Sequence, residues 1–431
     1  MNFIYSDSNK AYHTLDYYYK HKYGKKVAKI SLDGGFTCPN KDGTKGYGGC
    51  IYCSKLGSGD YAGDKRKDIV TQFNEQREII KKKWPDTLYI GYFQANTNTY
   101  AKVDVLKQKY EPIIKLDKVV GLNIATRPDA ISDKCLDYLE DLSKRTDLTI
   151  ELGLQTIHEK TTKLINRGHD LKCFEDMVKK LRKRNINIVV HIINGLPYET
   201  KEMMIETAKY LNNLDIQGIK IHMLYVIKNT LLEKLYQKEK FHILTEKEYI
   251  DITVSQLEYL RPEIVINRIT GDPVKKDLIE PTWVLKKVCV LNNIDKEFKK
   301  RRTYQGFNLS IENRINERLE YYLKPNSLVI NLDKNYKDKI NNIVTRGKVF
   351  NTIPTKEYKN KISLIILNYD KILNLDNLLS LIHSKGVILI KIALKDYKKI
   401  KDKLDNKNYQ VYINDTKESM LIELTPYKKG D

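Results

Sequence analysis

Short apolar runs that alternate with polar, helix-like stretches constrain the fold of this chain most strongly. The runs are VAKISL (27–32), TLYIGYF (87–93), VVGLNIAT (119–126), LTIELGL (148–154), INIVVHII (186–193) and GIKIHML (218–224). Between them, apolar residues recur at helical spacing, as in 67–84 and 173–185. Strands that alternate with helices predict βα units and a parallel sheet. In a βα barrel, the carboxyl ends of the strands and the loops after them carry the functional site.

The rest of the chain differs in pattern. Residues 245–304 predict a helical and loop extension, in which Thr245 followed by Glu248 forms an N-terminal capping pattern. Beyond about residue 308 there is no cysteine or tryptophan and little glycine. That part predicts a small second α/β domain. Its predicted strands are 326–333, 362–370, 386–394, 409–415 and 419–426, and its predicted helices are 375–386 and 395–406.

Three cysteines near the N-terminus, Cys38, Cys50 and Cys53, lie in the glycine-rich segment CPNKDGTKGYGGCIYC. Cys50 and Cys53 are close enough for one turn to direct both thiolates at one metal centre, and glycines let the loop fold around a bulky inorganic group. Three cysteines can hold three irons of a [4Fe–4S] cluster and leave the fourth iron open. The alternative is a structural zinc, with a fourth ligand from His13, His21 or a distant cysteine.

The composition limits the cellular location and the binding partners that we expect. The N-terminus has no apolar core of signal-peptide type, and no run of eighteen apolar residues occurs, so we expect a cytoplasmic protein with reduced thiols and no membrane contact. The formal charge is +21: residues 1–304 hold 53 basic and 40 acidic side chains, and the remainder hold 23 and 15. Such a spread of positive charge favours RNA as a partner. The alternative is a composition shaped by an AT-rich genome, since Lys, Asn, Ile and Tyr are all abundant.

Eight further blocks follow the cysteine loop in order. They are GYFQANTNTYA (91–101), ATRPDAIS (125–132), ELGLQT (151–156), NRGH (166–169), INGLPYET (193–200), HMLYVIKNTLLEKLY (222–236), INRITGDP (266–273) and TWVLKKVCVLNNID (282–295). With the cysteines, they resemble the YhcC/YtqA-type family of radical S-adenosylmethionine (SAM) proteins, whose cluster loop is Elp3-like. The resemblance runs from about residue 10 to about 307. It implies a partial (β/α)6 TIM-like barrel over 1–245 and an extension of this core over 246–307.

The same resemblance implies the chemistry. Cys38, Cys50 and Cys53 would hold a [4Fe–4S] cluster, SAM would bind its open iron, and a flavodoxin- or ferredoxin-type donor would supply the electron that releases a 5′-deoxyadenosyl radical. The family has been linked to 5-substituted wobble uridines, which implies a tRNA substrate and a carboxymethylaminomethyl to aminomethyl step. Two alternatives stay open: a radical SAM enzyme for a small metabolite or peptide, and a zinc-containing RNA-binding protein without catalysis.

The resemblance also implies site residues. The cofactor-binding candidates are Gln94, Asn96, Glu151, Gln155, Arg167 and Gly195. Gln94 and Asn96 would meet the methionine amine, Glu151 the ribose hydroxyls and Arg167 the methionine carboxylate, while Gly195 flanks adenine. The candidates for contact with substrate are Tyr92, Arg127 and His222, with Asp129, His169 and His191 nearby. The ordinary alternatives are a strand-end salt bridge for Glu151, a solvated helix position for Arg167, a turn for Gly195 and simple packing for the histidines. Cys135, Cys173 and Cys289 lack close cysteine partners, so no second cluster is predicted.

Three C-terminal segments resemble the small class I methyltransferase that often accompanies this family. They are ENRINERLEYYLKPNSLVINLD (312–333), ISLIILNYD (362–370) and LLSLIHSKGVILIKI (378–392). The glycine-rich loop that should follow the first strand is absent, because KNYKDK follows NLD. Residues 308–431 therefore predict a degenerate, Rossmann-like methyltransferase domain that does not bind SAM. The pathway implied above also makes a separate methyltransferase a possible partner. The alternative for the domain is any small α/β module used for packing.

Overall fold

The computed structural model describes residues 3–54, 57, 59, 61–354, 356–371, 374–404, 409–413 and 419–425. The chain forms two compact units, residues 1–305 and residues 306–431. Each unit has its own sheet and its own hydrophobic core. In the described part of the chain, no helix has both the length and the apolar character needed to cross a membrane.

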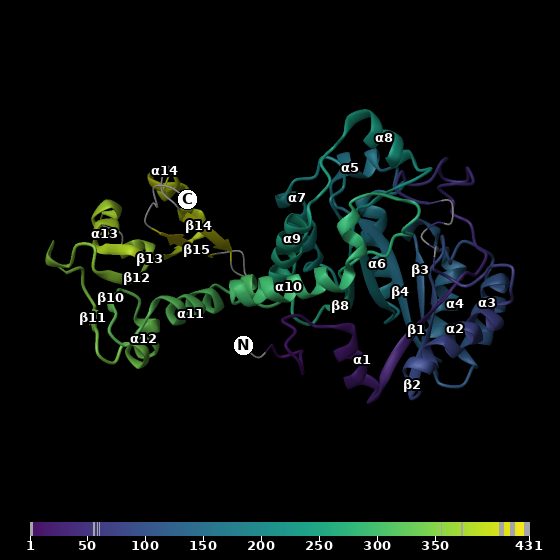
Figure 1. The fold of residues 1–431 in the computed structure, drawn as a ribbon, viewed down its shortest axis with the longest axis horizontal. Helices are drawn as coiled ribbons and strands as arrows, with labels where there is room; N and C mark the ends of the chain where they lie inside the picture. Colours follow the sequence, from purple (N-terminus) through teal and green to yellow (C-terminus); the bar gives the residue numbers. More distant parts are fainter. Residues whose placement is uncertain are drawn as a thin grey trace. The chain divides into compact units, whose positions relative to one another are not determined.

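The first unit is built on a seven-stranded parallel sheet in the order β1-β2-β3-β4-β5-β6-β8. The strands are β1 (Lys26–Leu32), β2 (Thr87–Phe93), β3 (Val119–Thr126), β4 (Asp147–Gln155), β5 (Asn187–Asn194), β6 (Gly218–Met223) and β8 (Val265–Arg268). The sheet curls into a half-barrel (Figure 1). The six strands expected from the apolar runs are all present, which confirms the predicted parallel α/β architecture.

Helices surround this sheet, and most of them connect consecutive strands (Figure 1). They are α1 (Leu15–Tyr23), α2 (Ile69–Lys83), α3 (Val103–Ile114), α4 (Asp133–Ser143), α5 (Glu159–Leu164), α6 (Leu171–Arg182), α7 (Lys201–Leu211), α8 (Leu231–Glu239), α9 (Glu246–Tyr259) and α10 (Lys287–Arg301). The helix α6 shows why they form: Asp170 caps its first turn, and Phe174, Val178 and Leu181 are buried at helical spacing.

The extension differs from its prediction in one respect. Helix α9 begins with the predicted capping box between Thr245 and Glu248. However, the extension also supplies β8, which pairs with β6 and adds a seventh strand to the sheet. The expectation of helix and loop alone is therefore wrong. Only two residues of this strand, Val265 and Ile266, are buried and apolar. Two residues are too few to show the pattern by which a strand is recognised in a sequence. A two-stranded sheet of β7 (Val226–Ile227) and β9 (Leu278–Glu280) lies in the same unit.

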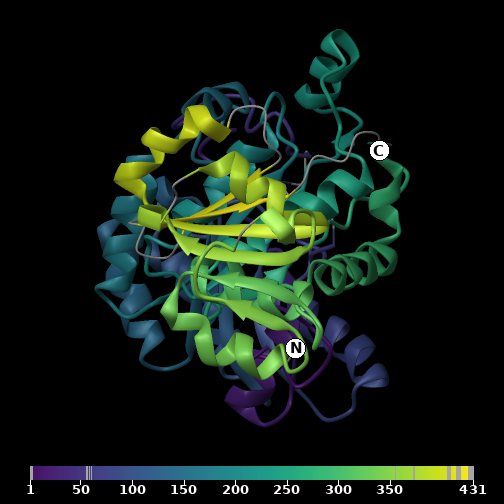
Figure 2. The same ribbon diagram turned by 90° about the vertical axis from the view of Figure 1, so that its left-hand side faces the viewer.

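The second unit contains a six-stranded mixed sheet in the order β11-β10-β12-β13-β15-β14. The strands are β10 (Leu328–Asn331), β11 (Lys348–Phe350), β12 (Ile362–Asn368), β13 (Ile382–Ala393), β14 (Tyr409–Ile413) and β15 (Ser419–Leu424). The first four strands of this order are parallel, and β15 is antiparallel to both of its neighbours. Figure 2 shows these strands side by side, with helices packed against them.

Apolar side chains cover both faces of the second sheet. On β12, Leu364 and Ile366 face one core, together with helices α11 (Ile311–Tyr322) and α12 (Lys337–Ile343). Ile365 and Leu367 face the other core, with helices α13 (Leu375–Leu381) and α14 (Tyr397–Leu404). Since successive side chains of a strand point to opposite faces, a continuous apolar run predicts burial on both sides.

Two details of the second unit correct the sequence prediction. The helix expected over 375–386 ends at Leu381, because Ile382 already pairs with Ile362 of the neighbouring strand. Gly386 lies where a Cβ would come within 2.8 Å of the Ile362 carbonyl oxygen, so close contact between strands explains this glycine. The short elements β11 and α12 were not predicted.

Candidate active site

A cavity of about 230 Å³ opens inside the half-barrel, at the carboxyl ends of its strands. It is lined by the cysteine segment, by the ends of β2 to β6 and β8, and by the loops that follow them. The predicted site residues that line it are Cys38, Cys50, Cys53, Tyr92, Gln94, Asn96, Arg127, Glu151, Gln155, Arg167, His169, His191 and His222. Gly195 is not among the lining residues. It adopts φ +86° after β5, and its amide donates to the sulfur of Met204 at 3.1 Å.

The cysteine loop is held by local turns and by the loop after α5. The Cys53 amide donates to the Cys50 carbonyl at 3.0 Å, and the Lys41 amide donates to the Cys38 carbonyl at 2.8 Å. Asn166 Nδ2 donates to the Gly49 carbonyl at 2.8 Å. The NRGH block therefore supports the cysteine loop, which sequence analysis did not anticipate.

Asn40 joins these two loops directly. It is 1% exposed, and its Nδ2 donates to the Asn166 carbonyl at 2.7 Å and points to the Cys50 sulfur at 3.8 Å. Such outer contacts orient thiolate ligands and tune their charge.

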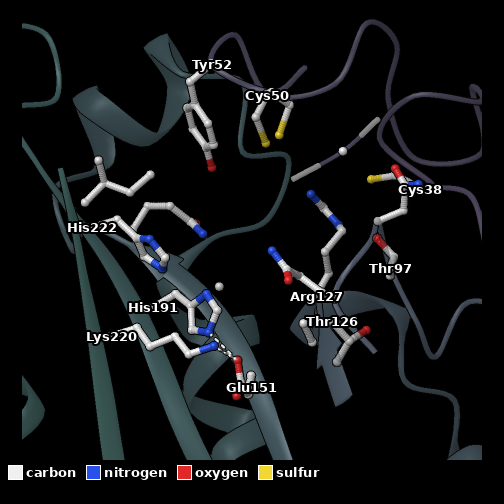
Figure 3. Close-up of a pocket in the computed structure, with 18 of the residues that line it drawn as sticks. Cys38, Cys50, Tyr52, Thr97, Thr126, Arg127, Glu151, His191, Lys220 and His222 are labelled. Carbon is white, nitrogen blue, oxygen red and sulfur yellow. Dashed lines mark hydrogen bonds and ion pairs between the residues drawn. The ribbon is translucent and has the colours of Figure 1, made fainter. Parts of the chain in front are cut away.

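The Cys50 and Cys53 side chains are hydrogen-bonded to each other, so two of the three sulfurs lie close together. Figure 3 shows Cys38 on the opposite side of an open space from Cys50. Among the residues that the structure describes, no three His, Cys, Asp or Glu side chains converge closely enough to hold a single metal ion. Neither His13 nor His21 lines the cavity. A wide three-cysteine arrangement around open space fits a [4Fe–4S] cluster better than a tetrahedral zinc.

Two arginines lie beside the cysteines, and both are anchored. Arg127 forms two hydrogen bonds with the Asp129 carboxylate, both at 2.9 Å, and a third with the Arg167 carbonyl at 2.7 Å. Arg167 is 1% exposed and donates to the backbone carbonyls of Thr156, His169 and Leu154. Its position excludes the solvated-helix alternative. Burial lowers the pKa of Arg167 to about 10.

The positive charges influence the nearby titrating groups. Burial and then Arg167 and Arg127 lower the pKa of His169 to about 3. A hydrogen bond from Cys53, with a contribution from Arg127, lowers the pKa of the Cys50 thiol to about 6. The same hydrogen bond, together with burial, raises the pKa of Cys53 well above its usual range. Within this pair the thiolate is therefore favoured at Cys50, and the thiolate is the form that binds iron.

Glu151 lies deeper in the cavity, in the middle of β4, and its carboxylate is fully buried. Its Oε1 accepts from Lys29 Nζ at 3.1 Å and Asn123 Nδ2 at 2.8 Å, and its Oε2 accepts from Lys220 Nζ at 2.5 Å and His191 Nε2 at 2.8 Å. These contacts use the four acceptor positions of a carboxylate. Burial alone would raise the pKa of Glu151, but Lys220 and Lys29 outweigh it and hold that pKa well below its usual range.

Lys220 and His222 lie two residues apart on β6 and point into the cavity from the same face (Figure 3). Lys220 Nζ also donates to the Tyr92 hydroxyl at 2.9 Å. Burial, only partly offset by Glu151, lowers the pKa of Lys220 to about 7. The His222 and His191 rings lie 5.1 Å apart, and burial followed by nearby positive charge holds the pKa of His222 well below its usual range.

Sequence analysis missed Lys220, Lys29 and Asn123. A signal existed in the run GIKIHML, where Lys and His alternate with isoleucines. Polar residues at a spacing of two on an otherwise apolar strand face one side of the sheet. In a barrel strand, that side is either the interior or the helix layer, and the interior carries the site.

Backbone strain is concentrated at the strand ends around the cavity. Asn96, after β2, and Gln155, at the end of β4, have φ of 58° and 62°. Non-glycine residues rarely adopt this left-handed conformation, and it clusters at functional sites. Gly57 packs so closely on Asn96 that a Cβ would lie 1.9 Å from its Oδ1. Gly57, four residues after Cys53, therefore contacts the loop after β2 directly.

Comparisons with known proteins agree with this geometry. The family profile described as radical SAM superfamily matches residues 43–211, and the radical SAM C-terminal domain profile matches residues 216–300. The fold is similar to that of the archaeal Methanocaldococcus infernus Elp3 with an N-terminal deletion, with a TM-score of 0.51, 16% identity and 68% of each chain covered. That likeness concerns the fold alone. Fold and family profiles together define an enzyme of the radical SAM class.

Curated relatives narrow the assignment. The chain is 50% identical to YtqA of Bacillus subtilis over 304 residues, which is 70% of this chain and 94% of YtqA. It is 34% identical to YhcC of Escherichia coli K12 over 263 residues, which is 61% of this chain and 84% of YhcC. The chain belongs to the radical SAM family that includes YtqA and YhcC. Membership implies a [4Fe–4S] cluster and SAM as cofactors.

Proposed function

We propose that this radical SAM enzyme modifies tRNA, converting a 5-carboxymethylaminomethyl group on wobble uridine towards 5-aminomethyl. The observation that carries the enzymatic part is the cavity that joins the three cysteines of one loop to a buried polar interior. In this proposal Cys38, Cys50 and Cys53 hold the cluster. When bound, the cluster and SAM supply a 5′-deoxyadenosyl radical that removes hydrogen from substrate.

The residues around the cavity divide into two groups. Gln94, Asn96, Gln155 and Arg167 line it together with the cysteines, and we assign them to SAM. Arg167 supports this assignment because its buried guanidinium, within the part of the chain that the structure describes, donates only to backbone carbonyls, and a carboxylate would complete it. Gly195 is left out of the assignment, since it does not line the cavity.

The second group faces the substrate. Glu151 already accepts four hydrogen bonds, so we assign it to positioning Lys220 and His191 rather than to the SAM ribose. Tyr92 and His222 are assigned to substrate contact because they line the deep end of the cavity. Arg127 is assigned to positioning, since Asp129 and the Arg167 carbonyl hold it. To reach these groups, a wobble base must leave the anticodon stack, as bases do in other nucleic-acid-modifying enzymes.

Positive charge supports RNA as the substrate. The excess of basic over acidic residues is present in residues 1–304 and again in the remainder of the chain. Neutralisation of phosphates by such residues binds RNA without reading its sequence. The similarity of this chain to Elongator complex protein 3 of Saccharomyces cerevisiae, 28% identical over 160 residues, supports the same proposal.

We also propose that residues 308–431 descend from a class I methyltransferase. Support comes from the strand order, in which the last strand in sequence, β15, is inserted antiparallel between β13 and β14. Class I methyltransferases insert their final strand in this way. The segment after β10 supports the loss of SAM binding: Asp333 caps a 3₁₀ turn, and the ring of Tyr336 is buried where a glycine loop would leave room for a nucleotide.

The proposal is tested by comparing tRNA nucleosides from cells with and without the gene. Cells that lack it are expected to accumulate 5-carboxymethylaminomethyluridine and to lose the aminomethyl-derived nucleosides. The anaerobically purified, reduced protein with SAM is then expected to convert that tRNA. An unchanged nucleoside profile, with SAM cleavage stimulated by a peptide or a metabolite instead, would contradict the tRNA assignment. A colourless protein with one bound zinc would contradict the cluster.

A further inference from the structure

The cavity carries more positive charge than its known cofactors explain. Among its described lining residues, Lys41, Arg127, Arg167, Lys220 and Arg268 are basic, whereas Glu151 alone is acidic. The first three basic residues lie near the cysteines, where their charges act on Cys50, Cys53 or both. Thiolates and the SAM carboxylate can balance them. Lys220 and Arg268 lie outside this group, so the thiolates and the SAM carboxylate do not explain their positive charge.

At the deep end, positive charges outnumber the carboxylates. Arg268 is paired with Asp272. Lys220 shares Glu151 with Lys29, which approaches the same carboxylate but does not line the cavity. One negative charge therefore faces two ammonium groups, of which that of Lys220 is buried and that of Lys29 is partly buried. Burial of an unbalanced charge costs free energy unless a partner arrives, and this excess is what an anionic ligand would relieve.

His222 supplies a second contact beside Lys220. Across the residues that the structure describes, its ring makes no hydrogen bond or ion pair, although it lies beside the tilted ring of His191 and lines the cavity. A neutral imidazole carries one N–H donor and one acceptor. Figure 3 shows the His222 ring directed into the open space above Lys220. The strand β6 thus presents an ammonium group and an unused imidazole to the same space.

We propose that Lys220 and His222 form a binding site for a carboxylate of the substrate, at the end of the cavity away from the cysteines. This inference rests on the proposed function, in which the substrate side chain ends in a carboxymethyl group. Lys220 would donate to the carboxylate while Glu151 and Tyr92 hold the ammonium group in place. His222 would donate to the second oxygen.

The carboxylate of SAM is the alternative ligand for Lys220 and His222, and the geometry disfavours it. SAM must reach an iron beside Cys38, Cys50 and Cys53. In Figure 3, Lys220 and Glu151 lie at the opposite end of the drawn cavity from Cys50. A substrate group enters that end without displacing SAM. The site would therefore select substrates that carry the carboxylate, rather than improve SAM binding.

The test compares two anticodon stem–loop RNAs that differ in one group. One carries 5-carboxymethylaminomethyluridine at the wobble position, and the other carries its methyl ester, which has nearly the same shape but no charge. Affinities for the holoenzyme with SAM are measured anaerobically by fluorescence anisotropy. The wild type is expected to prefer the acid by about 10- to 100-fold, the range for a hydrogen bond to a charged group. Lys220→Met is expected to reduce this preference below about 3-fold, and Lys220→Arg to restore part of it.

Lys29→Met is the matched control. It removes the other ammonium group on Glu151, but Lys29 does not line the cavity. If Lys220 only balances Glu151, both Met variants will behave alike, and the inference fails. If Lys220 binds substrate, Lys29→Met will keep the preference for the acid. His222→Leu is a second variant, independent of the Glu151 pair, and is expected to lower the preference by about 3- to 10-fold.

Equilibrium dialysis with SAM separates the two sources of carboxylate. Lys220→Met is expected to bind SAM within about 3-fold of the wild type; a larger loss would assign Lys220 to the cofactor and overturn the inference. If the wild type binds neither RNA specifically, the proposed function fails. The site formed by Lys220 and His222 is then tested by comparing sodium acetate with sodium chloride at equal ionic strength. Acetate should raise the melting temperature of the wild type more than that of Lys220→Met. Equal shifts would overturn the carboxylate site itself.

Discussion

The two units use parallel strands for opposite purposes. In the second unit, β12 alternates between two apolar cores, so both faces of its sheet are closed. In the first unit, the strands turn polar side chains such as Asn123, Glu151 and Lys220 into a cavity. The difference lies at every second residue of each strand, whose side chains share one face of the sheet. A similar α/β fold therefore forms either a closed apolar core or an active-site cavity, according to whether one face carries polar side chains.

The largest expected effect concerns the cysteine segment, which has no equivalent in the second unit. Cys50→Ala should abolish reductive SAM cleavage, because two remaining thiolates cannot hold the cluster with one iron open. The measurement is 5′-deoxyadenosine released anaerobically with a chemical reductant, together with absorbance near 400 nm. Cys173→Ala, which changes a thiol outside the cavity lining, is the control. Substantial cleavage by Cys50→Ala would remove the basis for the site.

Buried carboxylates provide a direct comparison of the two interiors. Glu151→Gln leaves the buried ammonium group of Lys220 and the partly buried one of Lys29 without a counter-charge. It should lower the free energy of unfolding by about 3–5 kcal/mol. Its counterpart is Glu423 in the second unit, whose Oε2 accepts from Arg318 Nε at 2.7 Å. Glu423→Gln should cost about 1–3 kcal/mol, because it breaks one charged hydrogen bond. Urea unfolding measures both. A larger loss for Glu423→Gln would mean that the first interior does not depend on its charge network.

Removal of residues 308–431 tests whether SAM cleavage depends on the first unit alone while tRNA binding depends on both units. The remaining chain should cleave SAM at close to the rate of the full protein, because the cavity lies entirely in the first unit. Its affinity for tRNA should fall by about 10-fold or more at low salt, since phosphate neutralisation depends on the number of basic residues. The isolated fragment 308–431 should show no SAM binding by calorimetry. Micromolar binding would mean that the segment after β10 does accept the cofactor.

RNA binding by the whole protein should weaken steeply as salt rises. Each neutralised phosphate releases counterions, so the logarithm of affinity should fall linearly with the logarithm of salt concentration. Filter binding between low and moderate salt, with heparin as a competing polyanion, measures this. A flat response would indicate that the charge of +21 reflects composition and not an RNA surface.

A pH dependence of stability is also expected, and it should belong to the first unit. The pKa of Lys220 falls from the ordinary 10.5 to about 7 in the folded chain. Between these values the unfolded chain binds the additional proton, so stability should rise with pH by up to about 1.4 kcal/mol per unit. Lys220→Met should remove that slope, and Lys391→Met, on β13 of the second unit, should not. Unfolding in urea at several pH values gives the comparison.

Local patterns were sufficient to predict much of this protein. Apolar runs located six strands of the first sheet, helical spacing located α2 and α6, and the Thr245–Glu248 pair located the start of α9. The cysteine segment and the ordered blocks identified the family. All of these signals depend on residues close together in the chain, where hydrogen bonding and side-chain periodicity act directly.

The tertiary structure decided the rest. Lys29 and Lys220 lie 122 and 69 residues from Glu151, and only the curvature of the sheet brings both onto one carboxylate. The sequence pattern predicts a helix at Ile382, but this residue lies in β13 because it pairs with Ile362 of β12. The local sequence therefore determined which elements form and which cysteines lie together. Their packing determined which charges share a buried space, because electrostatic and pairing energies depend on distance in space and not along the chain.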